Sequence, residues 1–378
     1  MSPVTIHAHL AEKRGTTGFD YLRIGLATAV VLWHSFPISY GQWAYDTALG
    51  LPVRALISLI LFMFFALSGF LVAGSLERNR LPAFLSLRAL RIFPALTVEV
   101  LLSALVLGPF LTTLPIAQYF SDHLFFRYIL NAVGIISFRL PEVFHTNPYP
   151  AVVNGSLWTV PYELECYIAL ALVALLGFVR RPRLFLCLCL VGAALLTAYF
   201  VAMDKPQQIS SGRALVFSFM IGVLIYVWRA HIPLLRSLAA VSALLCLIML
   251  QRSELFYFAC FPAAYLTVYI GLQNWSVPAL MRTGDYSYGI YLFAFPIQQV
   301  VASWPMLQKW WINFPISLLF CLLYAVFSWH AIEAPLMRRK RAVVELVNRA
   351  QDQFERNGRA LVYLKSWFGR VSRSTVER

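Results

Sequence analysis

A histidine inside an apolar segment is the residue of this sequence with the clearest chemical potential. His34 closes the stretch FDYLRIGLATAVVLWH, which is long and apolar enough to enter a lipid bilayer. An ionisable side chain in a spanning helix costs roughly 2.5 to 3.5 kcal/mol on insertion scales, so such residues usually face a bundle interior and mark a functional path. Because burial disfavours the charged imidazole, we expect His34 to be neutral and able to act as a general base. The alternative is a packing histidine satisfied by a neighbouring hydroxyl.

Two charged residues precede His34 on the same helical stripe. At about 100° per residue, steps of three and eleven residues bring Asp20, Arg23 and His34 onto one face. His34 then lies about 21 Å along the helix axis from Asp20. The sequence therefore predicts an acid and a base at one membrane surface and an imidazole deep in the membrane on the same line.

The composition indicates the class of protein that positions these residues. Of 378 residues, 60% are hydrophobic and 13% are charged, against about a quarter charged in ordinary globular domains. We therefore expect an all-α fold, a polytopic membrane helical bundle. Runs of about 20 apolar residues predict ten spans, near 20–40, 53–76, 91–112, 159–179, 183–202, 213–229, 234–250, 254–272, 286–302 and 314–333. Part of 113–158 is apolar but too short to span, which indicates a re-entrant or interfacial segment.

Basic residues are concentrated in the loops that this count puts on one side of the membrane. They are Arg78, Arg80, Arg88, Arg91, Arg180, Arg181, Arg183, Arg229 and the run from Arg338 to Arg341. This asymmetry predicts that both termini are cytoplasmic, and it accounts for the net charge of +14 through topology and contacts with membrane lipids. We therefore expect no nucleic-acid partner. The six cysteines fall in apolar runs without metal-ligand spacing, so we expect no metal.

The chain changes character near its C-terminus. Residues 338–378 hold eleven Lys or Arg against four acids, with apolar residues interspersed. This pattern is typical of an amphipathic segment on a membrane surface. We expect two units, a transmembrane domain over 1–337 and a basic cytoplasmic tail over 338–378. The alternative for the tail is a solvated helix without a function.

Four segments in order resemble the acyltransferase-3 family of integral membrane acyltransferases, which modify surface and secreted polysaccharides in bacteria. They are FDYLRIGLATAVVLWH (19–34), FFALSGFL (64–71) followed by LRALRIFPAL (87–96), NGSLWTVPYELECY (154–167), and SYGIYLFAFPIQ (287–298) with IEAPLMR (332–338). The family's arginine-x10-histidine motif maps onto Arg23 and His34. Its arginine-x-x-arginine motif maps onto Arg88 and Arg91. Ala294 stands where relatives often carry a histidine, so we assign no catalytic role there.

The resemblance implies a donor site at the cytoplasmic face. Arg88 and Arg91 are three residues apart and share a helical face, which suits bidentate binding of phosphate. Acyl-CoA, expected as acetyl-CoA, presents phosphates on that side, and we assign Arg23 and Ser68 to the same site. Ser68 and Gly69 would break the second span and admit a thin acyl-pantetheine arm. The alternatives are arginines that only set topology and small residues that only pack helices.

A second group of residues suits a glycan acceptor. We assign acceptor binding to Asn154, Trp158, Tyr167 and Tyr288. Glu163 and Tyr167 are four residues apart and share a helical face. At the outer mouth of its span, Glu163 would orient His34 or hold a sugar hydroxyl, while Trp158 would stack on a pyranose ring. The alternative is an aromatic-belt residue beside a carboxylate favoured by the helix dipole.

The function predicted from these residues is that of a membrane O-acyltransferase in the bacterial inner membrane. It would transfer an acyl group, expected to be acetyl, from cytoplasmic acyl-CoA to a hydroxyl of a glycan or lipid-linked glycan. His34 and Glu163 are the predicted catalytic residues, with direct transfer favoured over an acyl-histidine relay. A non-enzymatic alternative is a lipid or glycan exporter whose histidine, glutamate and arginines form a proton or substrate path.

Overall fold

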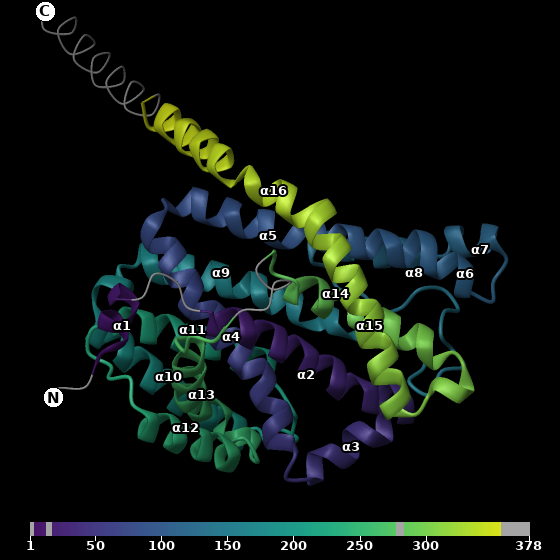
Figure 1. Cartoon of the computed structure of the whole chain (residues 1–378), viewed down its shortest axis with the longest axis horizontal. Coiled ribbons are helices and arrows are strands. Elements are labelled where there is room, and N and C mark those ends of the chain that lie inside the picture. The colour runs from purple at the N-terminus through teal and green to yellow at the C-terminus, as the bar shows by residue number, and fades with distance from the viewer. Residues whose placement is uncertain (1–3, 13–16, 277–282, 357–378) are drawn as a thin grey trace, which may run out of the picture.

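The computed structural model describes residues 4–12, 17–276 and 283–356 of the chain. Within these residues the chain forms helices and no strands, apart from two isolated bridges, which confirms the all-α class. The longer helices are α2 (Gly18–Tyr40), α4 (Arg54–Arg78), α5 (Leu81–Leu102), α9 (Val160–Leu175), α10 (Pro182–Ala202), α11 (Gly212–Val227), α12 (Arg236–Met249), α13 (Phe256–Gly271), α14 (Ser287–Ala302) and α15 (Trp310–Ser328) (Figure 1). The shorter ones are α1 (Ile6–Glu12), α3 (Gln42–Gly50), α6 (Gly108–Leu111), α7 (Ile116–Ser121), α8 (His123–Ile129) and α16 (Ala334–Arg338).

The predicted spans correspond to helices of unequal length. In the described part of the chain, 7 helices are long and apolar enough to cross a membrane. The predicted spans 213–229, 234–250 and 286–302 are occupied by α11, α12 and α14, which have 16, 14 and 16 residues. At 1.5 Å per residue these reach only about 21 to 24 Å, less than a hydrocarbon core of about 30 Å.

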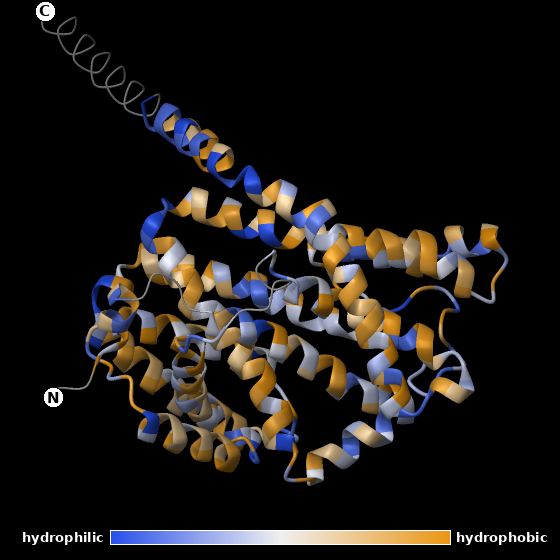
Figure 2. Cartoon of the chain, viewed as in Figure 1, coloured by the Kyte–Doolittle hydropathy of each residue, from blue (hydrophilic) through white to orange (hydrophobic). Residues whose placement is uncertain are grey.

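Apolar residues, coloured orange in Figure 2, occur along most of the helices, and many of the large ones are exposed rather than in the core. Large apolar residues are exposed along α10, α12 and α15, including Leu188, Leu195, Leu244, Leu247, Leu319 and Leu323. Soluble proteins rarely expose contiguous apolar surface of this kind. The fold is therefore that of a multi-pass membrane protein.

The close contact of α4 with α11 depends on two glycines. A Cβ on Gly69 would lie 2.0 Å from the carbonyl oxygen of Phe219, and one on Gly222 would lie 2.1 Å from that of Ala66. No other residue permits such an approach of two helix backbones. The predicted break at Ser68 and Gly69 is wrong, because α4 runs through both positions as one helix.

Helix α5 begins ten residues before the predicted span 91–112. It starts at Leu81, with Pro82 in its first turn, where a proline is favoured. Arg88 and Arg91 therefore lie on the helix rather than in the preceding loop. A search for apolar runs misses this start because arginines interrupt the run, although their side chains face the bundle interior.

The last helix is longer than predicted. After α15 the chain passes through a π-helical turn, η8 (Trp329–Glu333), into α16, and a further helix covers 340–356. Pro335 does not end the helix, because it lies in the first turn of α16, where a missing N–H is tolerated. The yellow C-terminal helix projects away from the bundle in Figure 1. Its Asp352 Oδ1 lies 2.5 Å from Arg80 Nη1. The tail residues 357–378 lie outside the described residues.

The region 113–158, which the structure describes completely, contains no helix of spanning length. It holds α7, α8, the short turn η2 (Leu130–Val133) and an irregular segment that leads to η3 (Gly155–Thr159). Asn131 anchors this segment, since its side chain bonds both the N–H and the carbonyl of Ser137. The segment delivers η3 and the start of α9 to the centre of the bundle.

Candidate functional site

A cavity of about 280 Å³ lies between α2, α4, α5, α9 and α14. We name it the arginine cavity, because Arg23, Arg88 and Arg91 line it. The structure also places Ser68, Glu163, Tyr167 and Tyr288 on its walls, so seven of the ten predicted site residues meet there. The remaining walls are mostly apolar.

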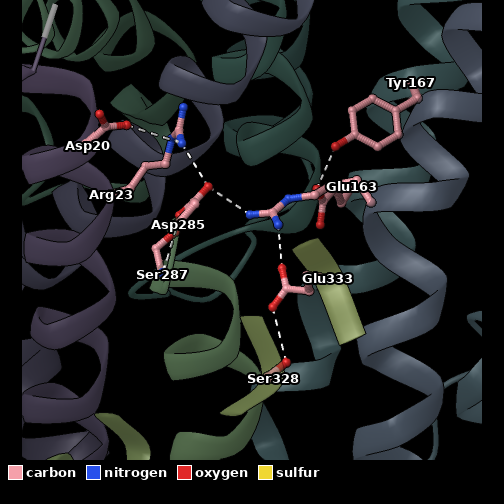
Figure 3. Close-up of polar contacts among 9 residues, drawn as sticks. Asp20, Arg23, Glu163, Tyr167, Asp285, Ser287, Ser328 and Glu333 are labelled. Carbon is pink, nitrogen blue, oxygen red and sulfur yellow. Dashed lines mark hydrogen bonds and ion pairs between the residues drawn. The ribbon is translucent and has the colours of Figure 1, made fainter. Parts of the chain in front are cut away.

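Arg91 forms ion pairs with two carboxylates, Asp285 and Glu333, both of which are labelled in Figure 3. Its Nη2 donates to Asp285 Oδ2 at 2.8 Å, and its Nη1 donates to Glu333. The same Asp285 oxygen accepts from Arg23 Nη1 at 2.8 Å. The pairing of Glu333 with an arginine joins the C-terminal helix to α5, while Asp285 joins α5 to α2.

Asp285, which directly precedes α14, is held in its charged form. Burial opposes ionisation of its carboxyl group, but the charges of Arg91 and Arg23 outweigh burial, and the pKa of Asp285 lies at about 2. The hydroxyl of Ser287 donates to its other oxygen at 2.5 Å. Asp285 is therefore ionised at physiological pH, and its single negative charge is shared by two arginines, of which Arg91 also pairs with Glu333.

Arg88 differs from Arg91, three residues further along α5, in its polar contacts. Among the described residues it has no hydrogen bond and no ion pair, and its Nε is buried without a partner. Its guanidinium carbon lies 5.9 Å from the ring centroid of Phe84. The arginine cavity thus contains one guanidinium committed to two carboxylates and another with its donors available to an anion.

Glu163 also lies on the wall of the arginine cavity, where it is hydrogen-bonded to Tyr167, one helical turn further along α9. Tyr167 Oη donates to Glu163 Oε1 at 2.6 Å, which confirms that the two residues share a helical face. Tyr288 lies nearby, with its hydroxyl donating to the carbonyl of Ile92 at 3.1 Å and its ring 5.2 Å from the guanidinium carbon of Arg91.

His34 lines a second cavity, also of about 280 Å³. We name it the histidine cavity. Its walls are rich in aromatic residues, namely Trp33, Tyr45, Tyr149, Trp158, Tyr291 and Phe295. The His34 ring meets Phe295 edge to face at a centroid distance of 5.2 Å, and its Nδ1 is buried without a partner. No hydroxyl bonds His34 among the described residues, so the packing alternative lacks the partner it required.

The structure does not bring Glu163 and His34 together. Glu163 borders the arginine cavity, and His34 borders the histidine cavity. Both Arg23 and His34 come from α2, but eleven residues separate them, which is about 16 Å along the helix. Orientation of His34 by Glu163 is therefore not supported by the geometry, whereas Trp158 does share a cavity with His34.

Asn154 borders neither of the two cavities. It is fully buried, and its Nδ2 donates to Glu99 Oε1 at 2.8 Å and to the carbonyl of Leu292 at 2.9 Å. Its Oδ1 accepts from the N–H of Ser156 at 3.1 Å, which caps η3. In this position the side chain ties η3 to α5 and α14 rather than facing a ligand.

Comparison with known proteins places this arrangement in a family. A family described as an acyltransferase domain, the acyltransferase-3 family, matches residues 16–332. The chain belongs to the acyltransferase-3 family. This acyltransferase is 25% identical over 351 residues to an O-acetyl transferase of Shigella phage Sf6, covering 87% of this chain and 98% of that protein. It is 28% identical over 363 residues to nodulation protein 10 of Rhizobium leguminosarum bv. viciae, covering 86% and 94%. No solved structure matches the chain significantly.

Two carboxylates that organise the acyltransferase, the buried Glu99 and the partly buried Asp285, are not among the site residues predicted from its sequence. Glu99 interrupts an apolar run, so the rule that singled out His34 would have found it. Ser103 Oγ donates to Glu99 at 2.9 Å. Asp285 carries a weaker signal, since it only precedes an apolar run, and its pairing with arginines of two other helices has no sequence signature.

Proposed function

We propose that this membrane acyltransferase transfers an acyl group, expected to be acetyl, from acyl-CoA to a hydroxyl of a cell-surface or secreted glycan. The observation that carries the proposal is that the arginine cavity and the histidine cavity share two wall residues, Leu61 and Tyr291. A donor whose phosphates bind at Arg88 therefore needs to pass only this wall to bring its thioester to His34.

The donor end of the proposal is supported by the different states of the two motif arginines. Arg88 has its donors available, so we assign it the contact with a CoA phosphate. Arg91 and Arg23 are held by Asp285, and we propose that they maintain the shape and the positive charge of the site. Ser68 adds a small polar group to the cavity wall, beside which a narrow pantetheine arm would fit.

In the proposed reaction, His34 accepts the proton of the acceptor hydroxyl while that oxygen attacks the thioester carbonyl. The new C–O bond forms, the C–S bond breaks, and the CoA thiolate leaves and takes the proton from the imidazolium. General base catalysis of this kind contributes about 10² to 10⁴-fold. Trp158, on the wall beside His34, would stack on the sugar ring of the acceptor. Glu163, Tyr167 and Tyr288 line the donor end and would contact the pantetheine arm.

We place the enzyme in the bacterial inner membrane with both termini in the cytoplasm. The concentration of basic residues in alternate loops supports this orientation. The arginine cavity then opens toward cytoplasmic acyl-CoA, and the histidine cavity lies toward the outer face, where a glycan or lipid-linked glycan is available.

The test is consumption of donor by purified protein in lipid nanodiscs. With radiolabelled acetyl-CoA and polysaccharide from the source cells, we expect one CoA thiol released for each acetyl ester formed on the glycan, detected by mass spectrometry. The His34→Ala variant serves as the control for uncatalysed hydrolysis. Glycan transport without any release of CoA would overturn the proposal and favour the exporter.

A further inference from the structure

Two side chains from different helices lie in the wall between the two cavities and contact both of them. Leu61 of α4 and Tyr291 of α14 are the residues that border both the arginine cavity and the histidine cavity. The neighbouring residues divide between the sides, since Thr159 faces the arginine cavity and Trp158 faces the histidine cavity. Leu61 and Tyr291 therefore mark the place where the two cavities come closest, and the direct path from one to the other runs beside these two side chains.

The two wall residues are held differently. The Tyr291 hydroxyl lies 2.7 Å from the Thr159 hydroxyl and donates to the carbonyl of Ser156 at 3.3 Å. Its ring meets Phe64 edge to face at a centroid distance of 5.9 Å. Leu61 is a partly buried residue that makes only apolar contacts, so no hydrogen bond holds its side chain in one staggered rotamer. In this wall, Tyr291 is therefore fixed by hydrogen bonds, whereas Leu61 can change its rotamer.

We propose that Leu61 and Tyr291 form a filter that selects the acyl group by its length, passing short acyl thioesters and excluding long ones. This inference rests on the proposed function, because it concerns the path of the donor from Arg88 to His34. A short acyl group adds little width to the pantetheine arm, so movement of Leu61 alone admits it. A longer, flexible chain passes the same opening only in its extended form, and each added methylene that is held extended beside the anchored Tyr291 ring costs conformational entropy.

The experiment compares initial rates of CoA release and ester formation with acetyl-, butyryl- and hexanoyl-CoA in nanodiscs. In Leu61→Ala we expect the ratio of the hexanoyl rate to the acetyl rate to rise at least tenfold over the unmodified protein. The matched control is Leu59→Ala, which removes the same atoms two residues away on α4 from a side chain that borders neither cavity. We expect the control to keep the original ratio.

A second variant tests the wall in the opposite direction. Leu61→Trp should lower transfer from acetyl-CoA at least a hundredfold, while the Kd for acetyl-CoA, measured by calorimetry, stays within about twofold. Tyr291→Phe keeps the ring but loses the anchor to Thr159, and we expect the chain-length ratio to rise by a smaller factor than in Leu61→Ala. Circular dichroism and gel filtration establish that each variant is folded.

The possible outcomes distinguish failure of the proposed filter from failure of the proposed acyltransferase function. If the unmodified protein releases no CoA from any donor, the proposed function fails. If it transfers acetyl groups but Leu61→Ala and Leu59→Ala show the same chain-length ratio, the filter is overturned while the function stands. Full activity of a folded Leu61→Trp variant overturns the filter in the same way.

Discussion

The guanidinium of Arg91 and the carboxylate of Asp285 lie 2.8 Å apart and tie the middle of the bundle together. Arg91 comes from α5, and Asp285 immediately precedes α14, 194 residues further along the chain. Because Asp285 also binds Arg23 of α2, one carboxylate sets the positions of three helices around the arginine cavity. The motif arginine Arg91 is thus paired with carboxylates from two other segments, whereas Arg88 has no ion pair among the described residues.

The first prediction separates these two arginines. Arg88→Gln should weaken acetyl-CoA binding at least tenfold and leave the thermal midpoint nearly unchanged, because the side chain has no hydrogen bond or ion pair to lose among the described residues, only a contact with the Phe84 ring at 5.9 Å. Arg91→Gln leaves the buried Glu333 unpaired and should lower the free energy of unfolding by about 3 kcal/mol. Calorimetric binding and thermal unfolding in detergent measure the two effects. Equal loss of stability in both variants would contradict the distinction.

The second prediction concerns pH and Asp285. A carboxyl group whose pKa is lowered in the folded state stabilises the fold above its ordinary value of 3.8, and this stabilisation is lost as the pH falls through about 2. The thermal midpoints of the unmodified protein and of Asp285→Asn should therefore differ by a constant amount from pH 5 to pH 8. That difference should shrink between pH 4 and pH 2. If the difference between the two thermal midpoints changes between pH 6 and pH 8, the pKa of Asp285 is not lowered as stated.

The third prediction concerns His34. His34→Ala should remain folded and membrane-inserted and should lose at least a hundredfold in acyl transfer, because the acceptor hydroxyl loses its base. The Kd for acetyl-CoA should not change, since Arg88 lies in the other cavity. The matched control is Trp33→Phe, a neighbour on the same cavity wall that offers no base. Normal transfer by a well-expressed His34→Ala variant would end the general-base hypothesis.

Much of the fold follows from the sequence because apolar length is a local property. The positions of α2, α4 and α10 follow from runs of about 20 apolar residues. The start of α5 does not, because Arg88 and Arg91 interrupt the run and only their neighbours in space explain why charges are accepted there. The predicted span 314–333 ends too early because the apolar run stops there, whereas the helix continues through a π turn and Pro335 into a charged segment.

The site was predictable only in part, because a sequence gives the position of a residue along its helix but not how helices rotate against one another. The shared face of Glu163 and Tyr167 lies within one helix and was predicted correctly. The separation of Glu163 from His34 depends on the packing of α9 against α2 and α4, which has no local signal. Leu61 looks like any other leucine in an apolar run, and only the cavities on both of its sides distinguish it.

The last prediction concerns orientation, which decides which cavity faces acyl-CoA. Single cysteines replace exposed residues in a background from which all six native cysteines have been removed. Lys205, in the link between α10 and α11, is exposed and suits a cysteine on the side opposite the termini. Ser253 lies on the same predicted side but is unsuitable, because it is buried and bonded to Arg54. Glu355, exposed on the C-terminal helix, suits the other side.

With both termini in the cytoplasm, an impermeant maleimide added to cells with a permeabilised outer membrane should label Lys205→Cys and should not label Glu355→Cys. After lysis both should react, which controls for accessibility. Labelling of Glu355→Cys alone in intact cells would show that the bundle has the opposite orientation in the membrane. Arg88 would then face away from cytoplasmic acyl-CoA, and the proposed path from the arginine cavity to His34 would run in the wrong direction for a cytoplasmic donor.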